Sequence, residues 1–216
     1  MPRDTFRIQE LFIHAVERGQ EERVRQYLLQ GARINHRSPD TGETALHLIM
    51  GMEPWHAGHD GVVNTLLEAG ADANVTDNDG RTPLLNAAWN GRTQAIRLLL
   101  SYGAKETLNV CDATEHITPL HAAVIACRDF GNPASDDNIS LLLAAGADVN
   151  RPDSDGWTPL HSCACYNLYT PALLLLENGA NPHLKDKRGN HPAQLAELYR
   201  HDDVRTLLHE YMHPWV

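Results

Sequence analysis

The sequence has few aromatic residues, no long apolar run and no cluster of basic residues. Phenylalanine, tryptophan and tyrosine make up 6% of its 216 residues, and nowhere do 18 apolar residues follow one another. A membrane-spanning helix is therefore not expected, and residues 1–7 have no apolar run behind them that would resemble a secretion signal. With 28 acidic against 18 basic side chains, the net charge of −10 provides no basic stripe for binding phosphates. Neither a nucleic acid nor a membrane partner is expected.

Cysteine is also scarce. The four cysteines are Cys111, Cys127, Cys163 and Cys165. Their spacing matches neither a disulfide framework nor a zinc site, and on a helix Cys163 and Cys165 would point about 200° apart. We expect reduced thiols, and hence a cytoplasmic protein.

What the sequence does have is internal repetition. Five Gly-Ala doublets follow leucine-rich runs at intervals of 39, 33, 43 and 33 residues, and they begin at Gly31, Gly70, Gly103, Gly146 and Gly179. Thr-Pro-Leu-His or a close variant recurs in phase, beginning at Thr44, Thr82, Thr118 and Thr158, with a degraded copy from His191. Each phrase predicts a helix start, because threonine can cap a helix and proline fits its first position. The doublet glycine predicts the end of a second helix.

With this period and both phrases in register, the sequence resembles the ankyrin-repeat family. The resemblance is clearest at residues 80–91, Gly-Arg-Thr-Pro-Leu-Leu-Asn-Ala-Ala-Trp-Asn-Gly, and at residues 146–161, which join Gly-Ala-Asp-Val-Asn to Thr-Pro-Leu-His. It extends over about residues 5–212. The resemblance implies an all-α solenoid of helix-turn-helix units joined by hairpin-like loops, which acts by binding rather than by catalysis.

The chain is expected to form a single domain, residues 1–216, that is a complete array and monomeric alone. Its units are expected at residues 4–40 (N-terminal cap), 41–79, 80–113, 114–155, 156–188 and 189–213 (C-terminal cap). Polar residues on the outer faces of the two end units favour the cap assignment.

Three insertions interrupt the period. About five extra residues fall within residues 50–60 and seven within 127–137, and both are expected to form loops between the two helices of their unit. Three more fall within residues 105–117, where Glu115 and His116 replace the expected turn glycine and predict an irregular loop. Trp55, in the first insertion, either folds back onto the array or contacts a partner.

The resemblance gives His47, His121 and His161 a structural role, a hydrogen bond to the neighbouring hairpin backbone. Their recurrence in phase argues against catalysis, because a general base is needed only once. The sequence also has no nucleophile motif and no phosphate-binding glycine loop, so no enzyme activity is expected.

Two other histidine groups are considered as candidates for a metal site. They are His56 and His59 with Asp60, and His201, His209 and His213. Neither group has a recognisable tetrahedral set of ligands, so no metal and no cofactor is expected.

By resemblance, a partner would contact the hairpin tips and the first helix of each unit. The residues at those positions are Asn78, Asp79, Arg81, Trp89, Asn90, His116, Ile117, Ile125, Ala126, Ser154, Asp155, Trp157, Cys165 and Tyr166, to which we add Trp55. Among these, Trp89, Trp157 and Tyr166 either anchor a partner or pack on one another across adjacent repeats.

The acidic residues of the hairpins fall into two groups. Asp77, Asp112 and Asp153 are expected to hold the turns together. Asp79, Glu115 and Asp155 are expected to form an acidic rim that attracts a basic partner.

The expected function is recognition of another protein, one with a basic surface. The chain would act as a stoichiometric inhibitor or immunity-type protein, or as an adaptor that recruits a larger complex. A hypothesis of another class is that the array is a substrate for asparagine hydroxylation, at Asn74 or Asn150.

Overall fold

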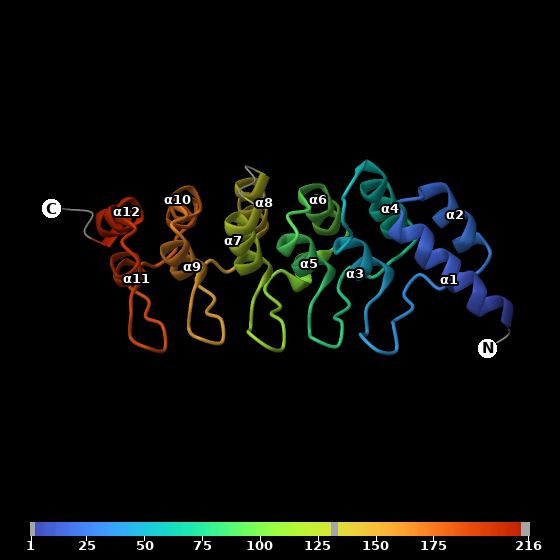
Figure 1. The fold of residues 1–216 in the computed structure, drawn as a ribbon, viewed down its shortest axis with the longest axis horizontal. Coiled ribbons are helices and arrows are strands. Elements are labelled where there is room, and N and C mark those ends of the chain that lie inside the picture. The colour runs from blue at the N-terminus through green and yellow to red at the C-terminus, as the bar shows by residue number, and fades with distance from the viewer. Residues whose placement is uncertain (1–2, 131–133, 213–216) are drawn as a thin grey trace.

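The structure is a computed structural model that describes residues 3–130 and 134–212, and the side chains of residues 6–128 and 136–212. In these residues the regular elements are all helical, and the helices follow one another in pairs along one axis (Figure 1). The helices are α1 (Arg3–Glu17), α2 (Glu21–Leu29), α3 (Ala45–Met50), α4 (Ala57–Glu68), α5 (Pro83–Trp89), α6 (Thr93–Ser101), the 3₁₀ helix η1 (Ala104–Thr107), α7 (Pro119–Phe130), α8 (Ala134–Ala145), α9 (Pro159–Tyr166), α10 (Tyr169–Glu177), α11 (Pro192–Leu198) and α12 (Asp202–Met212). The expected all-α solenoid is confirmed.

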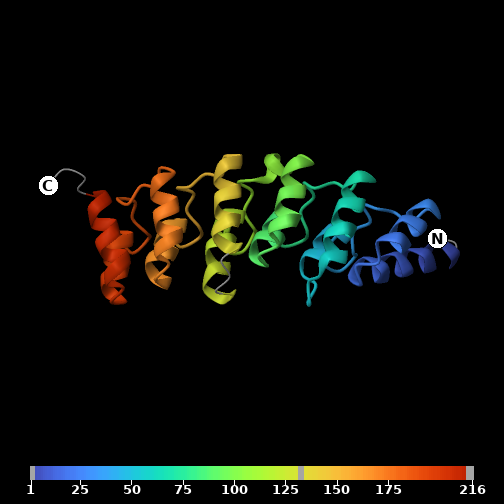
Figure 2. The ribbon, with the colours of Figure 1, turned by 90° about the horizontal axis from the view of Figure 1, so that it is seen from above.

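The array is elongated, with the N-terminal pair α1 and α2 at one end and the C-terminal pair α11 and α12 at the other (Figures 1 and 2). The loops between successive pairs all extend to the same side in Figure 1. The outermost part of each loop is closed by a backbone hydrogen bond between two residues. We call the segments between these bonded residues, with the bonded residues included, fingers 1 to 5. The closing N–H and C=O groups belong to Ser38 and Glu43, Asp77 and Arg81, Asp112 and Ile117, Asp153 and Trp157, and Asp186 and Asn190.

The helices begin where the repeated phrases predict. Pro83, Pro119 and Pro159 are the first residues of α5, α7 and α9, and the Thr82 hydroxyl accepts a hydrogen bond from the Leu85 N–H at 3.1 Å. The glycines of the five doublets follow the second helices with φ between 88° and 100°. Glycine adopts this left-handed conformation without a steric penalty, so it ends each helix.

Leucine and alanine side chains fill the space between successive pairs. Leu84, Ala88 and Leu99, for example, are fully buried. A unit of two helices has no other way to bury such a face, so the stability of each pair depends on its neighbours. No described helix is long and apolar enough to cross a membrane.

The first insertion folds back onto the array. The Trp55 ring centroid lies 5.1 Å from that of His59, and the Arg92 guanidinium lies over the Trp55 ring at 4.6 Å. Arg92 also donates a hydrogen bond to the carbonyl of Met52 at 2.9 Å and pairs with Glu53. Of the two alternatives for Trp55, the structure shows the folded-back one.

The second insertion is a correction. A loop was predicted over residues 127–137, but α7 continues to Phe130 and α8 begins at Ala134, so that each has 12 residues, whereas α5 and α6 have 7 and 9. The apolar run of α7 continues through Cys127, and Asp136 and Asp137 lie in the first turn of α8, where the helix dipole favours acidic side chains. Most of the inserted residues therefore lengthen a helix pair; residues 131–133 lie outside the described residues.

The third insertion does make an irregular finger. Two of its three residues lengthen the segment that contains η1, and one lengthens finger 3. His116 has φ +57° and takes the left-handed place that Gly80 and Gly156 take in fingers 2 and 4, at +78° and +81°. Finger 1 also has one residue more than fingers 2, 4 and 5, which the sequence analysis did not foresee.

Candidate functional site

Each finger is bound to the next by one backbone hydrogen bond. The donor and acceptor are Asn78 N–H and Thr41 C=O (2.9 Å), Ala113 N–H and Asp79 C=O (2.8 Å), Ser154 N–H and Glu115 C=O (2.8 Å), and Lys187 N–H and Asp155 C=O (3.0 Å). The backbones of Asp79, Glu115 and Asp155 are thus fixed while their side chains are exposed. The acidic rim exists as a row of solvent-facing carboxylates.

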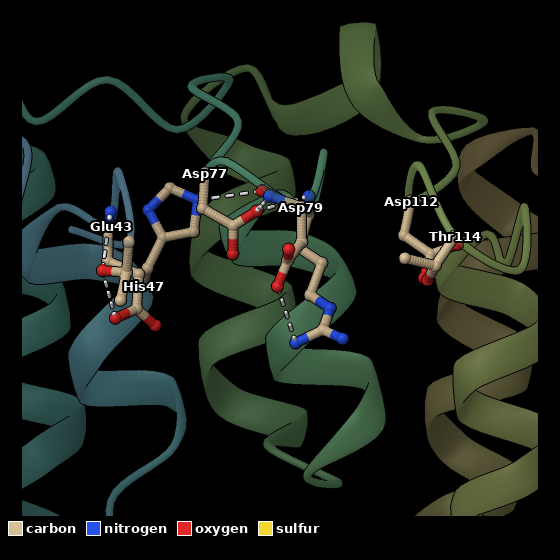
Figure 3. A network of polar contacts seen from close by, with 8 residues as sticks. Glu43, His47, Asp77, Asp79, Asp112 and Thr114 are labelled. Atoms are coloured by element: carbon tan, nitrogen blue, oxygen red, sulfur yellow. Dashed lines mark hydrogen bonds and ion pairs between the residues drawn. The ribbon is translucent and has the colours of Figure 1, made fainter.

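The second group of acids closes the fingers, as predicted. The Asp77 carboxylate accepts hydrogen bonds from the N–H groups of Asp79 and Arg81 at 2.9 and 2.8 Å, and Asp153 repeats the arrangement with Asp155 and Trp157. In finger 3 the acceptor is Asp112, which binds the Ile117 N–H and the Thr114 hydroxyl, both at 2.8 Å. Figure 3 shows Asp77 and Asp79 between His47 on one side and Asp112 with Thr114 on the other.

The repeated histidines bind successive units together. The Nε2 atoms of His47, His121 and His161 lie 3.1, 3.1 and 3.2 Å from the carbonyl oxygens of Arg81, Trp157 and Asn190. Each Nδ1 accepts a hydrogen bond from the N–H of the threonine three residues earlier, so the proton is on Nε2, which donates. Burial lowers the pKa of all three rings. Their predicted structural role is confirmed.

The junction between the α5–α6 and α7–α8 pairs has no such histidine. Leu85 occupies the equivalent position, is 2% exposed, and offers no donor to the carbonyl of Ile117. A pocket of about 460 Å³ lies at this junction, in the angle between α5 and finger 3. Its lining residues are Arg81, Leu85, Asn86, Trp89, Asn90, Asp112, Thr114, Glu115 and Ile117. We call it the junction pocket.

The junction pocket brings together four of the residues that the sequence analysis placed on the binding surface: Arg81, Trp89, Asn90 and Ile117. Glu115 was predicted only as part of the acidic rim and Asp112 only as a turn residue, while Leu85, Asn86 and Thr114 were missed. The sequence feature that could have pointed to this junction is Leu85, which occupies the position where three other copies of the phrase have histidine.

The three prominent aromatic residues have different surroundings. Trp89 is 40% exposed, whereas Trp157 is half-buried against the core and Tyr166 is half-buried with the Arg128 guanidinium 4.7 Å from its ring centroid. Among the described residues, no ring contact joins any two of the three. The alternative in which they pack on one another is therefore wrong.

Some of the other predicted contact residues offer little surface. Ile117 is only 5% exposed, because it closes finger 3, but it lines the junction pocket. Ala126 is 2% exposed and belongs to the core, so its placement on the surface is corrected. Ile125, Ser154 and Cys165 are half-buried, while His116 and Asn78 are exposed. Burial raises the pKa of the Cys165 thiol.

The histidine groups weighed as metal ligands have structural hydrogen bonds. His59 Nδ1 accepts from the His56 N–H at 3.1 Å, and its Nε2 donates to the Glu17 carbonyl at 3.0 Å, so both nitrogens are occupied. His201 Nδ1 lies 2.9 Å from the Ala164 carbonyl, and His213 lies outside the described residues. In the part of the chain that the structure describes, no group of three or more His, Cys, Asp or Glu residues is arranged to hold a metal.

The two asparagines weighed as modification sites have inter-unit hydrogen bonds. Asn150 accepts from the Asn181 N–H at 2.8 Å and donates to the Gly179 carbonyl at 3.2 Å. Asn74 accepts from the Thr107 hydroxyl at 3.1 Å. Their positions therefore add nothing in favour of hydroxylation.

Comparison with known proteins gives the same architecture. The family model for ankyrin repeats (3 copies) matches residues 11–109, 52–153, 104–186 and 125–215. Human neurogenic locus notch homolog protein 1 is 36% identical over 175 residues, which are 80% of this chain and 6% of that protein. Potassium channel AKT1 of Arabidopsis thaliana is 33% identical over 173 residues, 70% of this chain and 20% of the channel. The chain thus spans only a small part of these relatives.

Solved structures extend the likeness to nearly the whole array. An ankyrin repeat domain from Acinetobacter baumannii is 28% identical with a TM-score of 0.78, covering 93% of this chain and 96% of that one. A chain from the Bdellovibrio bacteriovorus predatory endopeptidase in complex with an immunity protein has a TM-score of 0.77 at 22% identity, covering 93% and 97%. The repeated phrases, the stacked pairs and these matches agree: the chain belongs to the ankyrin-repeat family, whose members are protein–protein interaction modules.

Proposed function

We propose that this chain binds another protein through the face formed by its fingers and by the first helix of each pair, with the junction pocket at the centre of the contact. The observation that supports this most strongly is Trp89, a large aromatic residue left 40% exposed at the mouth of a polar pocket. Partly exposed tryptophans beside pockets are typical of the few residues that dominate a protein interface.

The acidic rim supports a partner with a basic surface. Asp79, Glu115 and Asp155 project from fingers 2 to 4, whereas finger 5 carries Lys187 and Arg188. The chain as a whole has a net charge of −10. Such a field would steer a basic partner toward fingers 2 to 4 and make association faster at low salt.

For its role in the cell, we propose a stoichiometric inhibitor or immunity-type protein that works in the cytoplasm as a monomer. The same fold occurs in the complex of an endopeptidase with an immunity protein, although 22% identity shows the fold alone.

The alternative role is that of an adaptor, which would have to hold two partners at once. A second groove between α1 and finger 1, lined by Phe6 and Leu11 among others, favours that alternative. No disulfide joins the four cysteines, in keeping with a reducing compartment.

The test is affinity capture from the native lysate with three baits: the wild-type chain, Trp89→Ala and Tyr102→Ala. Tyr102 is a matched control, because it is 44% exposed and follows α6, away from the pocket. Proteins retained by the wild type and by Tyr102→Ala should be lost with Trp89→Ala, since truncating such an anchor costs about 2 kcal/mol or more of binding free energy.

Binding that survives Trp89→Ala would overturn the proposed surface, provided that the melting temperatures of the three baits agree. If the retained protein is an enzyme, its activity in the 1:1 complex separates the two roles. An inhibitor abolishes the activity, whereas an adaptor leaves it unchanged and holds a second protein at the same time.

A further inference from the structure

Resting on the proposed function, we propose that the junction pocket takes the guanidinium group of an arginine side chain from the partner, stacked on Trp89 and paired with Glu115. This assigns the centre of the contact a defined chemistry. Two features of this chain coincide at the junction pocket. Leu85 replaces the histidine that ties three of the other junctions, and finger 3 is longer by one residue than fingers 2, 4 and 5.

The chain already pairs arginine with its aromatic side chains in two places. The Arg92 guanidinium lies 4.6 Å from the Trp55 ring centroid, and that of Arg128 lies 4.7 Å from the Tyr166 ring centroid. Trp89 is 40% exposed, and among the described residues its ring has neither a guanidinium over it nor another ring beside it. An indole face is the best aromatic surface for a guanidinium, so a partner's arginine can make the contact that Trp55 and Tyr166 make internally.

Glu115 supplies the charge. Its carboxylate makes no hydrogen bond or ion pair within the described residues, whereas Asp112, the other acid lining the pocket, already binds Ile117 and Thr114. The Glu115 backbone is held by the bond from Ser154, so the side chain starts from a fixed point at the rim of the pocket. A carboxylate and a guanidinium form two parallel hydrogen bonds, a geometry that an ammonium group cannot match.

Arg81 is the only cation among the described residues that line the pocket, and it would repel a second arginine. It is paired with Asp79, however, with Nη1 and Oδ2 3.7 Å apart. Asp79, Arg81, Asp112 and Glu115 together carry a net charge of −2. The charge at the site therefore favours a cation over a carboxylate.

The experiment is an NMR titration of the full ¹⁵N-labelled chain with acetyl-Gly-Arg-Gly-amide. Three comparison peptides have citrulline, lysine or glutamate in place of arginine. We expect a dissociation constant of about 1 mM, a value typical of a single anchoring side chain, with the largest shifts at the Trp89 indole and at the backbone of residues 112–117. Lysine should bind more weakly, and citrulline and glutamate should not bind measurably.

Two variants separate the pocket from diffuse attraction by an acidic protein. Glu115→Gln should weaken arginine-peptide binding about tenfold, because it removes a charge-assisted pair. Asp155→Asn removes the same charge one finger away, outside the pocket, and should change binding less than about twofold. Equal effects of the two variants, shifts centred elsewhere, or preference for the glutamate peptide would overturn the proposal.

Failure of this proposal differs from failure of the proposed function. If the arginine peptide does not bind but Trp89→Ala still loses captured proteins, the binding surface stands and the arginine assignment falls. If the peptide binds and Trp89→Ala keeps every captured protein, the pocket is real and the proposed function is wrong.

Discussion

Two neighbouring junctions of the array use the same backbone connection between fingers but differ in the side chain beneath it. Between the α7–α8 and α9–α10 pairs, His121 is 1% exposed and binds both its own helix cap and the Trp157 carbonyl. One junction earlier, Leu85 fills the equivalent place, with no polar connection, and a pocket is present. We call the first junction closed, because the histidine ties it through hydrogen bonds, and the second open, because the leucine makes no polar contact and lines a pocket.

This contrast separates structure from function within a single repeat pattern. Residues that recur in phase, such as the histidines, hold neighbouring units together. Leu85 breaks this pattern and still buries an apolar side chain. Such a position makes the surface differ from one unit to the next, and a specific partner can be recognised there.

The largest expected effect is that of pH on the closed junctions. Burial lowers the pKa of His47, His121 and His161, so below about pH 6.5 the unfolded chain binds protons that the folded chain does not. The free energy of unfolding should therefore fall as the pH drops from about 7.5 to 5.5, by up to about 1.4 kcal/mol per pH unit for each histidine. Urea melts at several pH values measure this slope, and a flat profile would mean that the rings are not held neutral.

The next largest effect is expected for His121→Leu, which gives the closed junction the leucine of the open one. The substitution leaves the Trp157 carbonyl and the Thr118 cap without a partner, and should lower the free energy of unfolding by about 1 to 3 kcal/mol. It should also make the pH slope shallower. His209→Leu, at an exposed position of α12, is the control and should change stability by less than about 0.5 kcal/mol. Equal midpoints for the two variants would show that the histidine tie contributes nothing.

A smaller difference is expected in local opening. Residues 104–117, with a 3₁₀ helix, a lengthened finger and no histidine tie, should exchange their amide hydrogens faster than residues 71–81 and 147–157 in the free chain. Hydrogen exchange read by peptide mass measures this. Uniform protection across the three segments would show that the open junction is as rigid as the closed ones.

The smallest effect concerns the tip of finger 3. His116 has φ +57°, a conformation that disfavours residues with a Cβ, so His116→Gly should raise the free energy of unfolding by about 0.5 kcal/mol once the greater freedom of the unfolded glycine is included. A fall in stability would mean that the histidine side chain, though exposed, makes a favourable contact.

The sequence predicted most of the fold, because repetition shows each rule several times. Thr82-Pro83 and its copies mark helix starts, the doublet glycines mark helix ends, and His121 and its counterparts mark the ties. It failed where the chain departs from its own pattern. The turn-forming residues around Pro133 predicted a long loop, yet α7 continues to Phe130 and α8 begins at Ala134. Helix propensity over so few residues is too weak to predict whether they lengthen the helices or form a loop.

The binding site was predicted only in part, for a related reason. Trp89 and Arg81 occupy positions that vary within a repeat, and their position could be read from the phase. The pocket itself involves the replacement of histidine by Leu85 and the path of finger 3. Both are three-dimensional facts about how two units meet, and no single unit contains them.

The most direct test of the central claim, that binding centres on the junction at Leu85, is hydrogen exchange of the chain alone and in complex with the protein it captures. We predict that complex formation slows exchange most in residues 78–90 and 112–117, which contribute all the lining of the junction pocket. Slowing that is greatest at fingers 4 and 5, or on the second helices α6, α8 and α10, would contradict it.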